Sequence, residues 1–372
     1  MPTSQENTTN FIYLNAFNGM GGIEKFNRAL IESLLYCDTK CSFYSFYDQN
    51  LPKKFTKSYD FQYFPNKFFG VFKSFLAINK ADITIIGHLN LSVLGVLSKF
   101  LLPKKKIIFI VHGIEIWQQV SFVKKLAVQS ADYLLAVSEY SKQKLVEIYG
   151  IHPDKVIIFP NTLAADFQAP QQFDKPNYLL ERYDLAANQK ILFTLARLSF
   201  SEQYKGYDTV IATLPDLLAK HPDIHYVIAG KYDTQELERL RELSVLYNVE
   251  KYVTFTGFVA DTEVQDHYLL ADIFVMPSKG EGFGIVFIEA MACGVPVLAG
   301  NQDGSVDALL KGKVGSLVNP DDKTAIVMAI QELFTTHLDY TKKVGLQQTI
   351  LQHFGFRTFI ERTQKVLHLL RQ

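Results

Sequence analysis

The chain contains 372 residues, of which 48% are hydrophobic and 20% charged, and this length predicts two globular domains. Lysine plus arginine and aspartate plus glutamate number 38 each, and this balance argues against a nucleic-acid-binding protein. Three cysteines are too few for a disulfide scaffold, and no apolar run is long enough to span a membrane.

The N-terminal sequence MPTSQENTTN lacks the basic start and apolar stretch of a secretory signal, so we expect a cytoplasmic protein. Short β-rich runs then alternate with helical patterns, which is typical of parallel strands joined by crossover helices. Strands are expected at residues 11–14, 41–46, 83–86, 107–111, 133–137 and 156–159. Helices are expected at residues 23–35, 121–130 and 140–149.

A basic and aromatic segment at residues 53–75 contains five lysines and nine phenylalanines or tyrosines. Such a segment suits an anionic membrane surface, because aromatic rings sit at headgroup depth while lysines meet the lipid charge. This interpretation predicts a peripheral protein on the inner face of the plasma membrane. The alternative is that the rings belong to the core and the lysines are solvated, and both interpretations stay open.

The pattern restarts after a proline-rich linker at residues 160–176, with strands at 191–196, 226–229, 253–256, 273–276 and 297–299. Helices are expected at 207–220, at 235–247 and from residue 285. We therefore predict an α/β protein with doubly wound domains at 1–172 and 173–350. Their ligands are expected beyond the carboxyl ends of the strands, in a cleft between two facing domains. An amphipathic helix within 351–372 is predicted to pack back across this cleft.

The most informative segment is PSKGEGFGIVFIEAMACGVP, at residues 277–296. Its glycines permit a tight loop after a strand, and a helix from Ile285 presents free N–H groups that suit a phosphate. Glu281 lies in the loop and Glu289 follows it by eight residues, or two helical turns, which leaves the two carboxylates roughly on one side. Their carboxylates are suited to accept hydrogen bonds from the hydroxyls of a sugar or ribose.

EGFGIVFIE, followed by AMACGVPV, resembles the E-x7-E signature of the retaining glycosyltransferases of family 4, which have the two-domain GT-B fold. Six further segments occur in the order of that family: GGIEKFNRAL, VHG, ADYLLAVSEYSKQKL, FPN, LARLSFSEQYKGYD and TGFV. The resemblance covers nearly the whole chain and is weakest at about residues 38–80. It implies a GT-B fold and transfer of a hexose from a UDP- or GDP-linked sugar, with retention of configuration.

The resemblance also implies roles for individual residues. Arg197 and Lys205 would stabilise the charge that develops on the leaving diphosphate, and Glu281 would hold the sugar hydroxyls. His112 follows a predicted strand and would contact the transferred sugar. The donor-binding positions are Gly21, Gly22, Gly257, Val259, Gly282, Phe283, Gly284, Ile285, Val286 and Glu289. The acceptor-side candidates are Glu115, Trp117 and Ser138, together with Tyr13 and Asn15.

Metal chemistry is not indicated, because the sequence has no D-x-D arrangement and no histidine spacing typical of a metal site. We therefore expect no cofactor and no metal; the nucleotide sugar is a substrate. The predicted acceptor is a glycan or a lipid-linked oligosaccharide of polysaccharide or glycoconjugate biosynthesis. Two alternatives remain: a nucleotide-sugar epimerase of the same general fold, and a catalytically silent sugar-binding protein.

Overall fold

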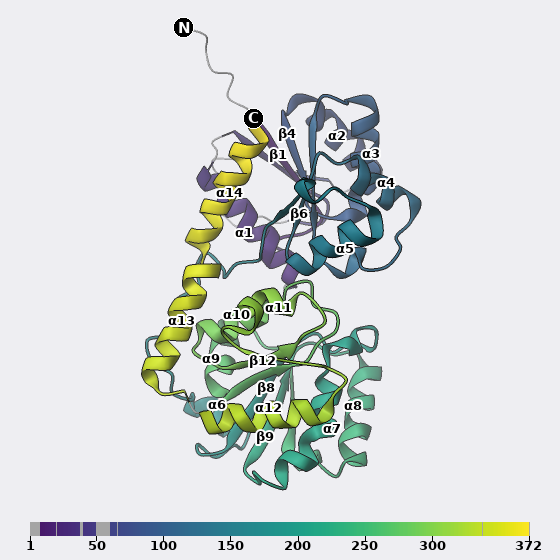
Figure 1. The fold of residues 1–372 in the computed structure, drawn as a ribbon. Coiled ribbons are helices and arrows are strands. Elements are labelled where there is room, and N and C mark those ends of the chain that lie inside the picture. The colour runs from purple at the N-terminus through teal and green to yellow at the C-terminus, as the bar shows by residue number, and fades with distance from the viewer. Residues whose placement is uncertain are drawn as a thin grey trace. The chain divides into compact units, whose positions relative to one another are not determined.

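The computed structural model describes residues 8–19, 21–37, 40–49, 60–64, 66–336 and 338–371 (Figure 1). It divides into two compact units. The first comprises Met1–Asp166 and Phe354–Gln372, and the second comprises Phe167–His353. Among the described residues, no helix has both the length and the apolar character needed to cross a membrane.

The first unit is built on a sheet of parallel strands in the order β3-β2-β1-β4-β5-β6-β7. The strands are β1 (Thr9–Tyr13), β2 (Cys41–Ser45), β3 (Asp60–Tyr63), β4 (Ile83–Ile86), β5 (Lys106–Val111), β6 (Tyr133–Ala136) and β7 (Val156–Ile158). All six predicted strands of this part are confirmed, with ends that differ slightly. The edge strand β3 was not predicted; it lies within the basic and aromatic segment. Lys53, Lys54 and Lys57 of that segment lie outside the described residues.

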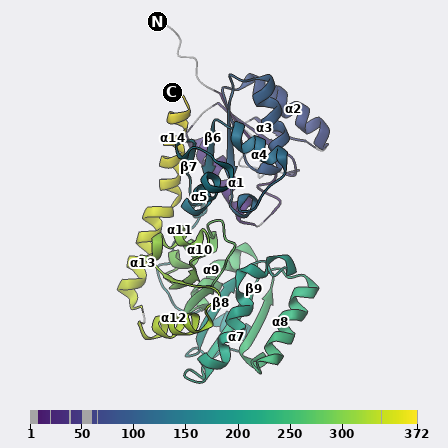
Figure 2. The same ribbon diagram turned by 45° about the vertical axis from the view of Figure 1, so that its right-hand side comes forward.

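Helices cover both faces of this sheet (Figures 1 and 2). One face carries α2 (Lys67–Lys80), α3 (Ser92–Leu101), α4 (Phe122–Ser130) and α5 (Glu139–Tyr149), each packed against the next. Their apolar sides form a core with the strands, in which Ile78, Leu94 and Val128 are fully buried against Ile86 and Phe109. Alternating β and α segments thus produce the predicted doubly wound arrangement.

The other face carries α1 (Gly22–Cys37) and α14 (Phe356–Arg371), which pack against each other. Phe359 of α14 lies between Phe26 and Phe159, with ring centroids 5.9 and 4.8 Å away. The buried Ser33 hydroxyl also donates to the Thr363 hydroxyl at 2.6 Å. The predicted C-terminal helix is therefore part of the first unit; its predicted course across a cleft stays a prediction.

The second unit contains a parallel sheet in the order β10-β9-β8-β11-β12-β13. The strands are β8 (Lys190–Leu195), β9 (Ile224–Ala229), β10 (Val253–Gly257), β11 (Ile273–Met276), β12 (Val297–Gly300) and β13 (Ser316–Val318). The five predicted strands are confirmed, and β13 is an additional short edge strand. Strand order reverses between β8 and β11, as it does between β1 and β4, so both units are doubly wound.

The helices of the second unit enclose a core that includes Leu192, Ile228, Ile273 and Leu298. They are α6 (Asn177–Arg182), α7 (Tyr207–Leu218), α8 (Thr234–Leu246), α9 (Asp261–Leu270), α10 (Ile285–Ala292), α11 (Ser305–Ala308), α12 (Lys323–Thr336) and α13 (Tyr340–Phe354). The predicted helices at 207–220, at 235–247 and from 285 correspond to α7, α8 and α10. The predicted class, an α/β chain of two Rossmann-like units, is confirmed.

Candidate functional site

The predicted donor residues of the second unit follow the carboxyl ends of its strands. Arg197 follows β8, Val259 follows β10, and Glu281 follows β11. Because β8 and β11 are the neighbours at which strand order reverses, their following loops diverge and leave room for a ligand. The structure therefore brings these residues to one edge of one sheet.

The glycine-rich loop after β11 is held by the carboxylate of Asp303, which follows β12. This fully buried side chain accepts the N–H of Glu281 at 2.7 Å and the N–H of Ser305 at 2.9 Å. The N–H of Gly304 in turn donates to the Glu281 carbonyl at 2.8 Å. Burial raises the pKa of Asp303 to about 6, although both N–H groups favour its charged form. The backbone of Glu281 is thus fixed from two sides.

Two glycines are required by the backbone around this loop. A Cβ atom at Gly304 would lie 2.0 Å from the Gly282 carbonyl oxygen, so no larger residue fits there. Gly284 has a φ of 86°, a left-handed conformation that favours glycine, and α10 begins at the next residue, Ile285. The side chain of Phe283 is buried, so its backbone is the part left for a ligand. The first turn of α10, with Ile285 and Val286, presents free N–H groups at this edge.

Lys205 and Glu281 form the central contact of the site. The Lys205 ammonium donates directly to the Glu281 carboxylate, and Lys205 is only 16% exposed. Glu202 lies between the two predicted cations, 3.0 Å from the Arg197 guanidinium and 4.0 Å from the Lys205 ammonium. Burial opposes the charge on Lys205, but Glu281, Tyr204 and Glu202 together raise its pKa, so it stays protonated. Arg197 is 69% exposed and so is accessible to an anionic ligand.

Glu289 is the fifth residue of α10 and is only 8% exposed. The hydroxyl of the fully buried Tyr268, on α9, donates to its Oε2 atom at 2.9 Å. Burial and the neighbouring carboxylate raise the pKa of Tyr268, so it remains a donor. Tyr268 therefore orients Glu289 from the interior of the unit.

The predicted base-side residues lie at the end of β10 and in the loop that follows it. Gly257 has a φ of 75°, and its carbonyl accepts the N–H of Gly230 at 2.8 Å. Val259 is buried, so its side chain packs inside the unit. This loop therefore offers backbone groups together with the Phe258 side chain, which is 58% exposed.

In the first unit, the predicted glycine pair lies at the start of α1. Gly22 is the first residue of the helix, and the Gly21 carbonyl accepts the N–H of Lys25 at 3.0 Å. The preceding loop is tied to the helix, because the Asn27 amide donates to the Asn15 carbonyl at 2.8 Å. Tyr13 ends β1 and is fully buried. These contacts place the N-terminus of α1 at the carboxyl edge of the sheet, after β1.

His112 follows β5, as predicted, and two neighbours fix its position. Its Nε2 atom lies 2.8 Å from the Gly87 carbonyl oxygen, so Nε2 carries the hydrogen and Nδ1 is left as an acceptor. Its backbone N–H donates to the Glu115 carboxylate at 2.5 Å. Burial lowers the pKa of His112 to about 4 and raises that of Glu115. His112 is therefore neutral near pH 7.

His88 follows β4 and is a residue that the sequence interpretation missed. Its ring lies 5.9 Å from the ring of His112, centroid to centroid. Its Nδ1 atom accepts the N–H of Asn90 at 3.0 Å, so the neutral ring carries its hydrogen on Nε2. Burial, with a smaller contribution from His112, lowers the pKa of His88 to about 4. The neutral ring of His88, with its Nε2–H donor, therefore lies beside the neutral ring of His112, with its Nδ1 acceptor.

The other acceptor-side candidates have structural contacts. Trp117 packs partly against the core and meets the Tyr140 ring at 5.0 Å in an edge-on arrangement. Ser138 is fully buried, and its hydroxyl accepts the N–H of Ser141 and so caps α5. Ser138 thus has a clear role in positioning a helix.

Four further side chains lie next to the predicted site residues and were not predicted themselves: His88, Glu202, Tyr268 and Asp303. His88 and Asp303 each follow a predicted strand, so the strand-end rule that selected His112 applies equally to them. Tyr268 lies in a helix, and only the fold brings it to Glu289.

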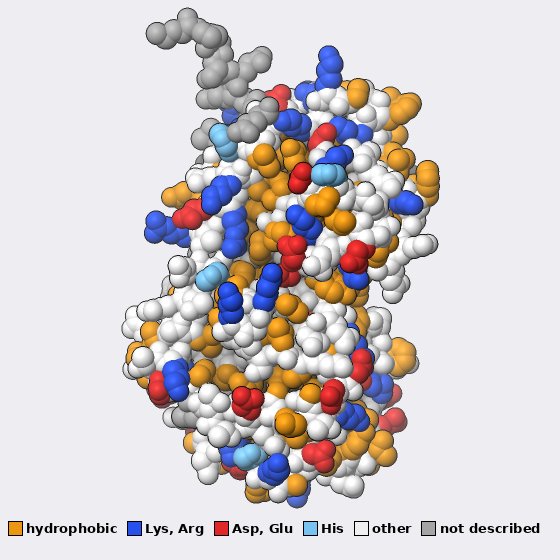
Figure 3. Space-filling model, viewed as in Figure 1, with side chains coloured by type: hydrophobic (Ala, Val, Ile, Leu, Met, Phe, Trp, Pro, Cys, Tyr) orange, Lys and Arg blue, Asp and Glu red, His pale blue; other side chains and the backbone are white. Residues whose placement is uncertain are grey.

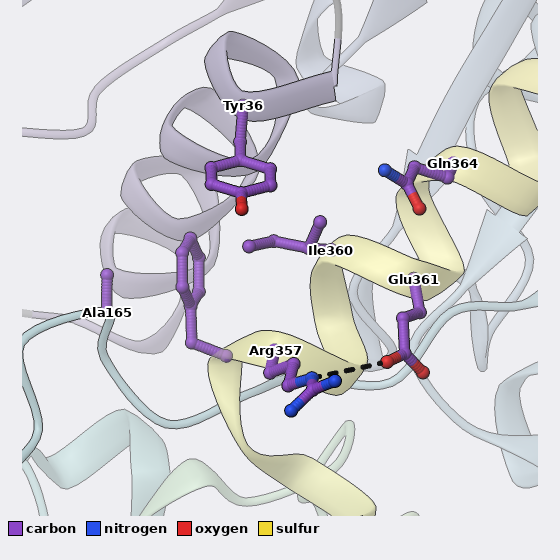
Figure 4. Close-up of a pocket in the computed structure, with 7 residues that line it drawn as sticks. Tyr36, Ala165, Arg357, Ile360, Glu361 and Gln364 are labelled. Carbon is purple, nitrogen blue, oxygen red and sulfur yellow. Dashed lines mark ion pairs between the residues drawn. The ribbon is translucent and has the colours of Figure 1, made fainter.

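A separate cavity of about 500 Å³ lies between α1 and α14 in the first unit (Figure 4). It is lined by Tyr36, Ala165, Phe356, Arg357, Ile360, Glu361 and Gln364. Arg357 and Glu361 form an ion pair at 3.7 Å on its rim. None of the predicted site residues lines it. In the described parts of the chain, no group of three or more His, Cys, Asp or Glu side chains is placed to hold a metal ion.

Comparison with protein families gives two matches that together cover most of the chain. Residues 20–167 match the model described as Glycosyltransferase Family 4. Residues 180–344 match the model described as Glycosyl transferases group 1. The two matches divide the chain near the linker between its two units.

The proteins that are similar to this chain include two relatives and one solved structure described here. The GDP-mannose-dependent alpha-(1-6)-phosphatidylinositol monomannoside mannosyltransferase of Mycolicibacterium smegmatis is 32% identical over 241 residues, which are 62% of this chain and 61% of that protein. The gpi3 subunit of phosphatidylinositol N-acetylglucosaminyltransferase from Schizosaccharomyces pombe is 26% identical, over 65% of this chain and 50% of that protein. The match thus spans only half to three fifths of these relatives.

The structure of Anabaena HepE in complex with UDP superposes with a TM-score of 0.78. It is 19% identical in sequence, and the superposition covers 97% of this chain and 99% of that chain. At this identity the likeness concerns the fold, which is the two-domain GT-B fold.

Proposed function

Because the chain belongs to glycosyltransferase family 4, we propose that it is a retaining hexosyltransferase that uses a nucleotide diphosphate sugar. The proposed acceptor is a glycan, and more specifically a lipid-linked oligosaccharide of polysaccharide or glycoconjugate biosynthesis. The proposed reaction uses no metal and no cofactor.

The observation that carries this proposal is the contact of Lys205 with Glu281 at the strand-order reversal. A cation, a sugar-binding carboxylate and the free N–H groups of α10 are the groups that a diphosphate sugar needs. Glu289, oriented by Tyr268, supplies an acceptor for ribose hydroxyls. The anchored loop keeps these groups in place before the donor binds, which favours binding and catalysis.

In the proposed reaction, the acceptor hydroxyl oxygen bonds to the anomeric carbon on the face that the diphosphate leaves. The bond between that carbon and the phosphate oxygen breaks, and the leaving phosphate oxygen takes the hydroxyl proton. Lys205 and Arg197 stabilise the negative charge that accumulates on the leaving diphosphate. His112 is positioned by Gly87 and Glu115 to contact a hydroxyl of the transferred sugar.

The related proteins support a nucleotide-sugar donor without fixing its base. The name of the mycobacterial relative specifies GDP-mannose, whereas the HepE structure contains UDP. Both named relatives act on phosphatidylinositol or its monomannoside, which supports a lipid acceptor here. A lipid acceptor would place the protein at a membrane surface, as a peripheral protein on the cytoplasmic side.

The test is calorimetry and thermal-shift measurement of the protein with UDP, GDP, UDP-glucose, UDP-N-acetylglucosamine and GDP-mannose, all with EDTA present. Glu289→Ala is the test variant, and Glu332→Ala, at an exposed position of α12, is the matched control. We expect one nucleotide family to bind without metal, the control to bind equally, and Glu289→Ala to bind at least about tenfold more weakly.

Absence of binding by any nucleotide would contradict the proposal and favour a silent scaffold. Product analysis with the bound donor then separates the remaining alternative. An altered sugar that stays on the nucleotide would indicate an epimerase, whereas the proposal expects a sugar transferred to an acceptor or, slowly, to water.

A further inference from the structure

The outer surface of α2, α3 and α4 carries an unusual set of exposed apolar side chains. Phe100 is 82% and Phe122 77% exposed, whereas large apolar side chains are normally exposed singly. These helices pack side by side, so their exposed residues lie on the same side of the first unit, where separate orange side chains are visible along the upper right edge of Figure 3. The apolar members are Phe69, Phe72 and Leu76 on α2; Val93, Leu97, Phe100 and Leu101 on α3; and Phe122, Val123 and Leu126 on α4. We call them the helical apolar face.

The spacing shows that each helix turns a second apolar stripe outward. On α3, Val93, Leu97 and Phe100 recur every three or four residues, on the side away from the buried Gly95 and Ser98. On α2, Phe69, Phe72 and Leu76 follow the same spacing. A helix that is needed only to cover the sheet requires one apolar stripe, so the outer stripe points to a partner.

The charge around this face has one sign. Between residues 67 and 131 the sequence contains nine lysines, no arginine and two acidic residues, Asp82 and Glu115. Asp82 accepts the N–H of Thr8, and Glu115 accepts the N–H of His112, so both are engaged in the framework of the unit. Lys99 is paired with Asp132 at 2.9 Å. Other lysines, including Lys73, Lys104, Lys105 and Lys125, have no ion-pair partner among the described residues.

The lysines stand beside the apolar side chains. The Lys73 ammonium lies 5.3 Å from the centre of the exposed Phe69 ring. Lys104 and Lys105 lie three and four residues after the end of α3, close in sequence to Phe100 and Leu101, and Lys125 lies on α4 itself. Apolar side chains that enter the headgroup region and flanking lysines that meet lipid phosphates are the two components of peripheral membrane binding.

We propose that the helical apolar face, with its flanking lysines, docks the protein on an anionic phospholipid bilayer. This deepens the proposed lipid-linked acceptor, because docking would bring the first unit to its substrate. It also relocates the membrane contact, from the whole basic and aromatic segment to three adjacent helices. Phe64 in that segment is buried, so part of the segment belongs to the core.

The test is cosedimentation of the full chain with vesicles of equimolar phosphatidylglycerol and phosphatidylcholine, compared with pure phosphatidylcholine vesicles. The apolar variant is Leu97→Ser with Phe100→Ser, and the charge variant is Lys104→Glu with Lys105→Glu. The matched control is Val245→Ser with Leu246→Ser, which removes two exposed apolar side chains from α8 of the second unit. Thermal unfolding checks that each variant is folded.

We expect the wild type and the control to bind the anionic vesicles, with weaker binding to the neutral ones. Each surface variant should lose at least about tenfold in partition, and binding of the wild type should weaken with salt. All four substituted residues lie outside the core, and one variant changes apolar side chains whereas the other changes charged ones. One variant therefore remains informative if the other fails to fold.

The proposal is overturned if the wild type does not bind anionic vesicles, or if both surface variants bind as well as the control. It is also overturned if the face proves to be a dimer interface, which sedimentation velocity without lipid would show as self-association lost in Leu97→Ser with Phe100→Ser. Vesicle binding is measured without nucleotide, whereas nucleotide binding is tested with the Glu289→Ala variant of the second unit. Failure of docking and failure of the proposed enzymatic function are therefore distinguishable.

Discussion

Lys205 and Glu281 are separated by 76 residues, yet the ammonium of one contacts the carboxylate of the other. In the proposed function both side chains act on the donor, the first on its diphosphate and the second on its sugar. The ion pair seen without a donor therefore competes with the phosphate for Lys205.

This competition gives a prediction for nucleoside diphosphate binding. Glu281→Gln removes the competing charge, so its affinity for the diphosphate should equal or exceed that of the wild type, while transfer falls by about 100-fold or more. Lys205→Met should lose affinity for the diphosphate. Calorimetry with UDP and GDP measures both. Equal loss of nucleotide binding in the two variants would show that Lys205 does not meet the phosphates.

The hydrogen bond from Tyr268 to Glu289 predicts that a change at Tyr268 weakens nucleotide binding only through the ribose hydroxyls. Tyr268→Phe removes one hydrogen-bond donor from the largely buried Glu289 carboxylate. The loss should cost about 1–3 kcal/mol, either in the orientation of Glu289 or in the stability of the fold. We expect weaker binding of the ribonucleotide but little change for its 2′,3′-dideoxy analogue. An equal loss for both nucleotides would mean that Tyr268 affects the whole loop rather than Glu289.

Asp303 is predicted to act as the anchor of the glycine-rich loop. An asparagine has one acceptor oxygen in place of the two that receive the N–H groups of Glu281 and Ser305. Asp303→Asn should therefore lower the unfolding free energy by about 1–2 kcal/mol and weaken nucleotide binding. Asp303→Glu, which keeps the charge but is longer, should also fail to restore binding. Unchanged calorimetry for both variants would remove Asp303 from the site.

His88 performs two tasks that substitution can separate. Its Nδ1 accepts the N–H of Asn90, and its Nε2 hydrogen is available to a hydroxyl next to His112. An asparagine oxygen can replace Nδ1 but cannot replace the donor at Nε2. His88→Asn should therefore unfold at the wild-type temperature but raise KM for the sugar substrate about tenfold or more. Kinetics unchanged by this variant would restrict His88 to its local structural bond.

The lowered pKa of His112 predicts how the first unit responds to acid. An unfolded histidine binds a proton below about pH 6.5, whereas folded His112 stays neutral down to about pH 4, so stability is lost as pH falls between these values. The loss should be about 2 kcal/mol between about pH 7 and about pH 5. Asp303, whose folded pKa is raised, contributes with the opposite sign.

The measurement for this prediction is urea unfolding as a function of pH for the wild type and His112→Asn, since subtraction of the two profiles cancels Asp303. The variant should lose less stability on acidification than the wild type. Parallel profiles would contradict the assigned pKa.

The fold was predictable wherever the hydrophobic pattern alone determines it. The runs at residues 107–111 and 273–276 are continuously apolar, because strands inside a parallel sheet are buried on both faces, and they became β5 and β11. Edge strands lack this signal. Asp60–Tyr63 alternates between exposed and half-buried residues, and Ser316–Val318 is short, so β3 and β13 were missed.

The site was only partly predictable for a related reason. The sequence contains the residues that a motif preserves, such as Glu281 and Glu289, but not the side chains that position them. Tyr268 reaches Glu289 through the packing of α9 on α10, and Asp303 reaches Glu281 through the pairing of β11 with β12. Such contacts depend on which elements become neighbours, and the spacing of residues along the chain does not give this.

The packing of α14 on α1 has a consequence for the order in which the protein is made. Phe359 packs on both Phe26 and Phe159, so the first unit lacks part of its interior until α14, which ends at Arg371, has left the ribosome. The second unit is continuous in sequence and is complete earlier. Synthesis therefore completes the second unit before the first, and the first unit remains open at α1 until α14 has been made.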